Sequence, residues 1–209
     1  PGKVFHRGAN MEHQIILASG SAIRRSMLAN AGLGFQCVSA RIDEAAIIQS
    51  MQSDGAGARD IADTLARQKA QKIARKNPQA LVIGCDQVLE LNGRLLQKPS
   101  DPANAIEQLR ALSGHEHKLY AAAVIYDGET PVWRHIGVAR MDLRKLGDDF
   151  IKGYVAQNWS EIQHCVGCYQ IEAAGAALFN RIDGDYFSVL GLPLLELLGY
   201  LRQRGALKE

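Results

Sequence analysis

Two kinds of hydrophobic pattern follow one another along the chain: short apolar runs, and longer stretches with helical spacing. The apolar runs predict strands at residues 15–18, 35–40, 81–85, 88–91, 94–96, 119–126, 132–143, 176–182 and 186–190. Apolar positions three and four residues apart predict helices at residues 24–31, 59–76, 102–112, 148–157 and 193–204. Residues 45–57 have weak periodicity and two glycines, which favours a loop or a frayed helix. Because helices and strands interleave, the pattern predicts the α/β class with a mixed sheet.

The size and composition of the chain restrict its function. A length of 209 residues fits one domain, or two small lobes around one cleft. A formal net charge of +2 is too small for a general basic coat that holds duplex nucleic acid. With 6% aromatic residues, Trp133 and Trp159 are too sparse for a base-stacking platform. We therefore expect no nucleic-acid partner.

The ends of the chain and its cysteines indicate the compartment. Residues 1–10 lack the apolar core of a secretory signal and are interpreted as an expression-tag remnant, which leaves a single domain over residues 11–209. The most apolar stretch, residues 187–201, is broken by Pro193 and Glu196 and is shorter than the ~20 residues of a membrane span. Four cysteines are too few for a disulfide scaffold. We therefore expect a cytoplasmic protein with no membrane partner.

A phosphate-binding turn is the first candidate for chemistry. Ser19, Gly20 and Ser21 lie between a predicted strand and a predicted helix, and Arg24 follows one helical turn later. Small residues at a helix N-terminus bring backbone donors close to an anion. The alternative interpretation is that a serine caps the helix and the arginine is solvated.

Carboxylates follow two of the predicted strands. Asp86 comes directly after the buried strand at residues 81–85, and Asp43-Glu44 follows the strand at 35–40. A carboxylate at the end of a buried strand requires a cation or hydrogen-bond donors, and the strand ends of such sheets face the ligand crevice. Together these groups could hold a hard divalent cation through oxygen. Asp86 could instead be a turn or cap residue, and Glu44 a surface residue.

Two lysines have unusual positions. Lys69 lies four residues from Leu65 and from Ile73, so it falls on the apolar stripe of its helix. Lys98 follows a hairpin predicted at Asn92-Gly93 and precedes Pro99. The alternatives are a lysine that extends to the rim of the core and a plain loop lysine.

Cys165 and Cys168 have the spacing of a thiol redox pair or of half a zinc site. No second ligand pair has a matching spacing. A redox switch on the site stays open as an alternative, but we expect both thiols to be reduced and dispensable.

Seven short segments, in the right order, resemble the Maf family of nucleoside triphosphate pyrophosphatases. They are Leu17-Ala18-Ser19-Gly20-Ser21 with Arg24, Asp43-Glu44, Ala66-Arg67-Gln68-Lys69-Ala70, Ile83-Gly84-Cys85-Asp86-Gln87, Lys98-Pro99, Leu112-Ser113-Gly114, and Ile182-Asp183-Gly184-Asp185-Tyr186-Phe187 with Gly191-Leu192-Pro193. The resemblance extends over residues 14–204. It implies a mixed twisted sheet with flanking helices, two lobes around a central cleft, and a possible homodimer.

The resemblance also implies an activity and roles for residues. The activity is hydrolysis of the α,β phosphoanhydride of a nucleoside triphosphate, with Mg²⁺ or Mn²⁺ as cofactor. By motif position Asp86 resembles the general base and Glu44 its catalytic partner, the two forming the metal-side carboxylates. Arg24, Lys69 and Lys98 resemble the phosphate ligands. The alternative is a nucleotide-binding regulator of cell division without turnover, which would not need the two carboxylates.

The base preference rests on two further residues. Gln87 and Glu172, with His164-Cys165 and Gly167, resemble the branch of the family that acts on 7-methyl-GTP, whereas residues 184–187 resemble the general branch. A carboxylate at Glu172 can accept two hydrogen bonds from the guanine edge. The alternative is that Glu172 is a solvated loop residue. We therefore expect guanine-type or methylated purines to be preferred over dTTP and UTP.

Overall fold

The computed structural model describes residues 14–207 of the chain, and the predicted tag remnant at residues 1–10 lies outside them. A seven-stranded mixed sheet runs through the molecule in the order β2-β1-β3-β5-β6-β7, and β4 pairs with β3. The strands are β1 (Gln14–Ala18), β2 (Gln36–Cys37), β3 (Ala80–Leu91), β4 (Arg94–Leu96), β5 (Glu116–Asp127), β6 (Thr130–Leu143) and β7 (Phe179–Asp183). The β2-β1 and β1-β3 pairs are parallel and the other pairs are antiparallel. The predicted mixed sheet is confirmed.

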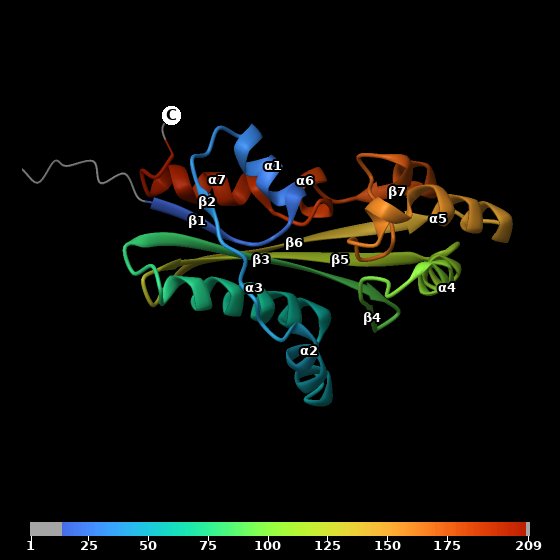
Figure 1. Cartoon of the computed structure of the whole chain (residues 1–209), viewed down its shortest axis with the longest axis horizontal. Coiled ribbons are helices and arrows are strands. Elements are labelled where there is room, and N and C mark those ends of the chain that lie inside the picture. Colours follow the sequence, from blue (N-terminus) through green and yellow to red (C-terminus); the bar gives the residue numbers. More distant parts are fainter. Residues whose placement is uncertain (1–13, 208–209) are drawn as a thin grey trace, which may run out of the picture.

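Helices cover both faces of this sheet (Figure 1). They are α1 (Ala22–Asn30), α2 (Glu44–Ser53), α3 (Ala58–Ala74), α4 (Pro102–Leu112), α5 (Asp148–Ile162), α6 (Tyr186–Val189) and α7 (Leu194–Gln203), with a short 3₁₀ turn at Ala174–Leu178. α3 packs on one face against Val82 and Val88 of β3, whereas α1 and α7 cover Leu81 and Ile83 on the other. α4 and α5 enclose a separate core at one end of the sheet.

Successive side chains of β3 therefore point to opposite faces of the sheet and pack into two different hydrophobic cores. The edge of β3 that pairs with β1 is paired only as far as Gly84, and β4 takes up the same edge again at Leu89. No described strand pairs with residues 85–88 on that edge. This gap in the sheet is where a ligand can reach the backbone and side chains of β3.

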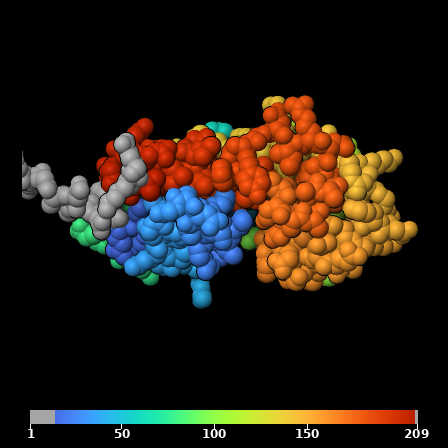
Figure 2. Space-filling model, turned by 90° about the horizontal axis from the view of Figure 1, so that it is seen from above, coloured from blue at the N-terminus to red at the C-terminus, as the bar shows by residue number. Residues whose placement is uncertain are grey.

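The space-filling view shows two halves with a notch between them (Figure 2). Residues near the N-terminus, in blue, and residues near the C-terminus, in red, form the surface of one half, and residues around 150–180, in orange, form most of the other. The predicted fold class, an α/β sheet with flanking helices and two lobes around a cleft, is confirmed. None of the helices within residues 14–207 is both long and apolar enough to span a bilayer. The cytoplasmic location and the homodimer stay predictions.

Several predicted elements differ from the structure. The strand predicted at residues 186–190 is instead the short helix α6 (Tyr186–Val189), and Asp185 caps this helix by accepting a hydrogen bond from Ser188 N at 2.9 Å. The run at 176–182 divides into the 3₁₀ turn and β7, and the strand predicted at 35–40 is reduced to two residues. The stretch at 45–57 is mainly the regular helix α2, although no residue of α2 is buried. The weak hydrophobic periodicity of this segment reflects the fact that α2 fully buries none of its residues against the rest of the protein.

The position of Asp86 is also corrected. The sequence places it just after a strand, but β3 continues to Leu91, so Asp86 lies within the strand and opposite Ala122 of β5. The parallel partner β1 is the strand that ends here, because its last residue, Ala18, pairs with Gly84. Asp86 therefore faces a crevice at the carboxyl end of a strand, as predicted, but that strand is β1, and Asp86 itself lies in the middle of β3.

Candidate active site

A pocket of about 720 Å³ opens at the unpaired edge of β3. Its lining residues come from the β1-α1 turn, α2, α3, β3, the segment after β4 and the end of α5 with the loop that follows. All nine residues singled out from the sequence line it: Ser19, Ser21, Arg24, Glu44, Lys69, Asp86, Gln87, Lys98 and Glu172. The structure thus brings together residues that are up to 153 positions apart in the chain.

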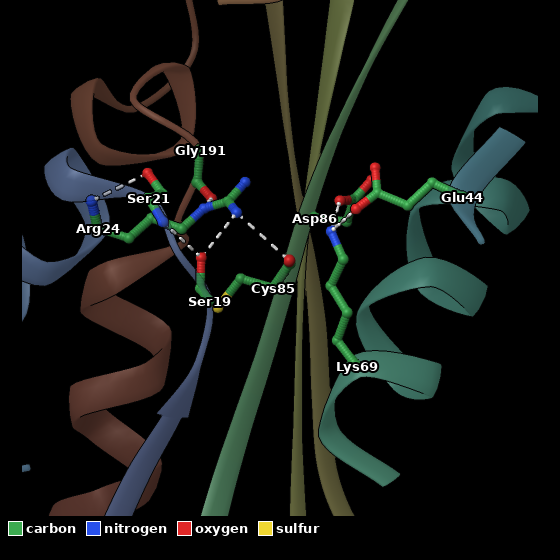
Figure 3. Close-up of polar contacts among 8 residues, drawn as sticks. All are labelled: Ser19, Ser21, Arg24, Glu44, Lys69, Cys85, Asp86 and Gly191. Atoms are coloured by element: carbon green, nitrogen blue, oxygen red, sulfur yellow. Dashed lines mark hydrogen bonds and ion pairs between the residues drawn. The ribbon is translucent and has the colours of Figure 1, made fainter. Parts of the chain in front are cut away.

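On the α3 side of β3, Lys69 joins the two carboxylates (Figure 3). Its Nζ lies 2.5 Å from Asp86 Oδ1 and 2.8 Å from Glu44 Oε1. The side chains of Lys69 and Asp86 are each 10% exposed, whereas that of Glu44 is 49% exposed. Burial of an isolated charge is costly, and direct pairing offsets that cost. The position of Lys69 on the apolar stripe is therefore explained by its partners, not by extension to the rim.

The approach of α3 to β3 makes this contact possible. A Cβ atom at Gly84 would lie 2.2 Å from the Ala66 carbonyl oxygen and 2.6 Å from the Ala70 amide nitrogen. The backbone of α3 therefore sits directly on Gly84. Because side chains two residues apart on a strand share a face, Asp86 lies on this same face, within reach of Lys69.

Glu44 is supplied by α2. Asp43 caps this helix by accepting a hydrogen bond from Ala46 N at 3.0 Å, and Glu44 is the first residue of the helix. Asp43 does not line the pocket, so the carboxylate pair of the sequence separates into a capping residue and a site residue. A carboxylate in the first turn also suits the positive end of the helix dipole.

Burial raises the pKa of the Asp86 carboxyl above its ordinary value, and the positive charges of Lys69 and Arg24 oppose that rise. Glu44 adds a smaller upward contribution through charge repulsion. A buried carboxylate with an elevated pKa is a better proton acceptor than a solvated one. Asp86 is accordingly the strongest candidate for a general base in this pocket.

On the opposite side of β3, Arg24 is held by three acceptors (Figure 3). Its Nε donates to Gly191 O at 2.7 Å, and its Nη1 donates to Cys85 O at 3.3 Å and to Ser19 Oγ at 3.4 Å. The bond to Cys85 O uses the unpaired edge of β3. Within residues 14–207 no acceptor forms a hydrogen bond with Nη2, so this nitrogen of the guanidinium group can donate to an anion.

Ser21 is the N-cap of α1, because its Oγ accepts from the Arg24 backbone amide at 3.5 Å. This is the capping alternative considered for the turn. Both serines nevertheless lie at the pocket wall, and the helix N-terminus points its remaining donors toward it. Capping and anion binding are therefore compatible here.

Gln87 has a role that the sequence did not indicate. Its Nε2 donates to Ser188 O at 3.1 Å and to Val189 O at 2.9 Å, which ties β3 to α6. Only its carbonyl oxygen is left for a ligand. A contact over about 100 positions has no local signal in the sequence, so this function of Gln87 could be seen only in the fold.

Comparison with known proteins identifies the family. A family model described as Maf-like protein matches residues 14–204. The chain belongs to the Maf family. A nucleoside triphosphate pyrophosphatase from Roseobacter denitrificans is 52% identical over 197 residues, which cover 94% of this chain and 99% of that protein. One from Ruegeria pomeroyi is 51% identical over 92% of this chain and 97% of its own length. A 7-methyl-GTP pyrophosphatase from Rhizobium meliloti is 46% identical over 94% of this chain and 99% of its own length.

The far end of the pocket in this Maf-family chain is formed by the end of α5 and the loop after it. Besides Glu172 and Lys98, this end includes Glu161, Tyr169 and Gln170, which sequence reasoning did not select. It also includes His164 and Cys165, which the sequence linked to the 7-methyl-GTP branch of the family and, for Cys165, to a thiol pair. The loop turns sharply at Gly167 and Cys168, which have φ angles of +80° and +61°. Lys98, Glu161 and Glu172 form no ion pair with any residue in 14–207. These charges are therefore available to a ligand.

The cysteines at this end are free thiols. Burial raises the pKa of Cys165, and it raises that of Cys168 to about 12. A raised pKa keeps a thiol protonated and therefore slow to react. The expectation that both thiols are reduced and dispensable stays a prediction, and their chemistry favours it.

The carboxylates of Glu44 and Asp86 fit part of a Mg²⁺ or Mn²⁺ site. Both point at one position, that of Lys69 Nζ, and hard cations prefer carboxylate oxygens. Among residues 14–207 no cluster of three or more His, Cys, Asp or Glu side chains could hold a metal ion. Mg²⁺ is commonly held by one or two carboxylates together with water and substrate phosphates, so the donor set suits a cation that arrives with a nucleotide.

Proposed function

We propose that this protein is a nucleoside triphosphate pyrophosphatase that hydrolyses the α,β phosphoanhydride and releases a nucleoside monophosphate and pyrophosphate. The observation that carries the proposal is the buried Asp86, which faces a pocket lined by Arg24, Lys69 and Lys98. The names of relatives about 50% identical over nearly the whole chain support the same activity.

In this mechanism Asp86 activates water. Lys69 binds Oδ1, and no residue within 14–207 donates to Oδ2, which leaves that oxygen to accept a proton from water. The water oxygen then forms a bond to the α-phosphorus while the bond from that phosphorus to the bridging oxygen breaks. The electron pair of the broken bond leaves with pyrophosphate, and Asp86 retains the proton until solvent removes it.

The cations of the pocket stabilise the charge of the substrate. A triphosphate carries about four negative charges near neutral pH, which matches three cationic side chains and a divalent ion. Arg24, fixed by Gly191 O and Cys85 O, presents its free Nη2 to the phosphates. Lys69 and Lys98 contribute point charges from the other walls. A divalent cation held by Glu44 and Asp86 would add electrostatic stabilisation of the phosphoryl oxygens.

Pyrophosphate release decides between turnover and binding alone. Purified protein with Mg²⁺ or Mn²⁺ is expected to release pyrophosphate and monophosphate from a nucleoside triphosphate in a 1:1 ratio, without orthophosphate as a first product. Tight nucleotide binding with no product at all would favour the regulator of cell division. Orthophosphate as the first product would place the attack at the γ-phosphorus and contradict the mechanism.

A substrate panel tests the base preference. We propose faster hydrolysis of GTP and 7-methyl-GTP than of dTTP and UTP, since the Glu172 carboxylate can accept hydrogen bonds from both N1 and N2 of guanine. Glu172→Gln should reduce that preference by about tenfold, the loss expected for charge-assisted hydrogen bonds. The measurement is kcat/KM for each triphosphate.

Glu161→Gln is the matched control for this variant. It removes an equal charge from the same end of the pocket. If Glu172 acts through hydrogen bonds, Glu161→Gln leaves the ranking of bases unchanged. A panel led by dTTP or UTP, or a ranking unaffected by Glu172→Gln, would show that the assignment of Glu172 to the base is wrong.

A further inference from the structure

Lys69 occupies the position at which the two metal-side carboxylates converge. Its ammonium contacts Asp86 and Glu44 at 2.5 and 2.8 Å, and no other cation within residues 14–207 forms an ion pair with either carboxylate. Arg24, a half-buried cation of the pocket, donates to acceptors on the opposite side of β3 (Figure 3). The negative charge of the two carboxylates is therefore already neutralised in part by the ammonium group of Lys69.

We propose that Lys69 masks this carboxylate pair, so that the nucleotide-free protein binds divalent cations weakly. The inference rests on the proposed function only in that it takes Glu44 and Asp86 as the cation ligands. A divalent ion that approaches the pair meets a like charge within hydrogen-bond distance of both carboxylates. In the interior of a protein, charges at such distances interact strongly even at a high effective dielectric constant.

Burial holds the ammonium in place. The Lys69 side chain is only 10% exposed, so little water can reach its ammonium to replace the two carboxylate partners. The close contact of α3 with Gly84 fixes the backbone from which it extends. An ammonium has three donors, and the ion pairs with Asp86 and Glu44 use two of them, which leaves one for a phosphate oxygen of an incoming nucleotide.

Direct binding of Mn²⁺ to the nucleotide-free protein tests the masking. Free Mn²⁺ is measured by electron paramagnetic resonance during titration of wild type, Lys69→Met and Lys69→Arg. Lys69→Met retains most of the length and the apolar stem but removes the charge, and we expect it to bind Mn²⁺ tenfold or more tightly than wild type. Lys69→Arg keeps the charge and is expected to bind Mn²⁺ as weakly as wild type.

Two further variants locate the effect. Lys98→Met removes a pocket charge that is not paired with Glu44 or Asp86, and it should leave Mn²⁺ binding unchanged. Glu44→Gln in the Lys69→Met background should abolish the gain in affinity. If Lys69→Met is poorly folded by circular dichroism, Lys69→Gln replaces it in the same comparison.

The inference is overturned if neutral variants of Lys69 bind Mn²⁺ no more tightly than wild type. It is also overturned if Lys98→Met raises the affinity equally, because the effect would then be one of general pocket charge. These measurements require no turnover. Pyrophosphate release by wild type tests the proposed function separately, so failure of one leaves the other intact.

Discussion

Asp86→Asn is expected to lower the turnover number for pyrophosphate release by about a hundredfold or more, the usual contribution of a positioned general base. Asparagine has nearly the same shape but cannot accept the proton of the attacking water. The substitution also removes one of the two anionic partners of Lys69 and leaves Glu44 as the other. The measurement is the steady-state rate of pyrophosphate formation at saturating substrate, so that substrate binding does not limit the rate.

Two controls separate the loss of a base from a loss of structure. The thermal unfolding midpoint of Asp86→Asn should remain close to that of wild type, and Asp142→Asn, a similar change at the far end of β6, should keep full activity. Pyrophosphate release near the wild-type rate from Asp86→Asn would reject Asp86 as the base. In that case its carboxylate would serve mainly as a counterion that holds Lys69.

The elements with strong local signals were predictable from the sequence. The Asn92-Gly93 hairpin is present, with φ angles of +50° and +78° that suit these two residue types. The helix after Asp101 begins at Pro102, and Asp101 caps it by accepting from Asn104 N at 2.8 Å. Signals of this kind act within a few residues, so tertiary contacts did not override them.

The candidate site was predictable for a different reason. A lysine on an apolar stripe and an aspartate beside a buried strand are both costly unless paired, and the structure pairs them with each other. Lys98 was selected by its position after the hairpin, and Glu172 by the family resemblance. Neither residue carries such a local cost, because both are exposed. A charged residue at a position predicted to be buried was thus a useful signal, but exposed site residues give no such signal.

What could not be predicted depends on contacts between distant segments. An apolar run such as residues 186–190 does not distinguish a strand from a short helix, and the choice is made by the Asp185 cap together with the packing of Ser188 on Gly137. A Cβ at Gly137 would lie 2.0 Å from Ser188 Oγ, so α6 can pack on β6 here only because residue 137 has no side chain. The tie from Gln87 to α6 is equally non-local.

Gly84→Ala is expected to impair both stability and catalysis. The new methyl group would lie 2.2 Å from the Ala66 carbonyl oxygen and 2.8 Å from Ala70 Cβ. A backbone atom cannot turn aside as a flexible side chain can, so α3 must move away from β3. Forced overpacking of this kind costs about 1–3 kcal/mol of unfolding free energy, which denaturant titration measures.

The catalytic loss in Gly84→Ala follows from the same movement. Lys69 extends from α3, whereas Asp86 extends from β3, so a shift of the helix changes their distance without altering either residue. Misplacement of a catalytic group by about 1 Å can cost on the order of a hundredfold in rate. We therefore expect kcat/KM for pyrophosphate release to fall by about that factor even under conditions in which the variant is fully folded.

Gly153→Ala is the matched control, since a Cβ there meets no atom within 4 Å and the residue lies within α5. It should preserve activity and stabilise the protein by about 0.5–1 kcal/mol, because alanine loses less backbone entropy than glycine in a helix. A Gly84→Ala protein with wild-type stability and wild-type kcat/KM would mean that α3 can give way without moving Lys69 from Asp86. The close approach of helix and strand would then not be what positions the candidate active site.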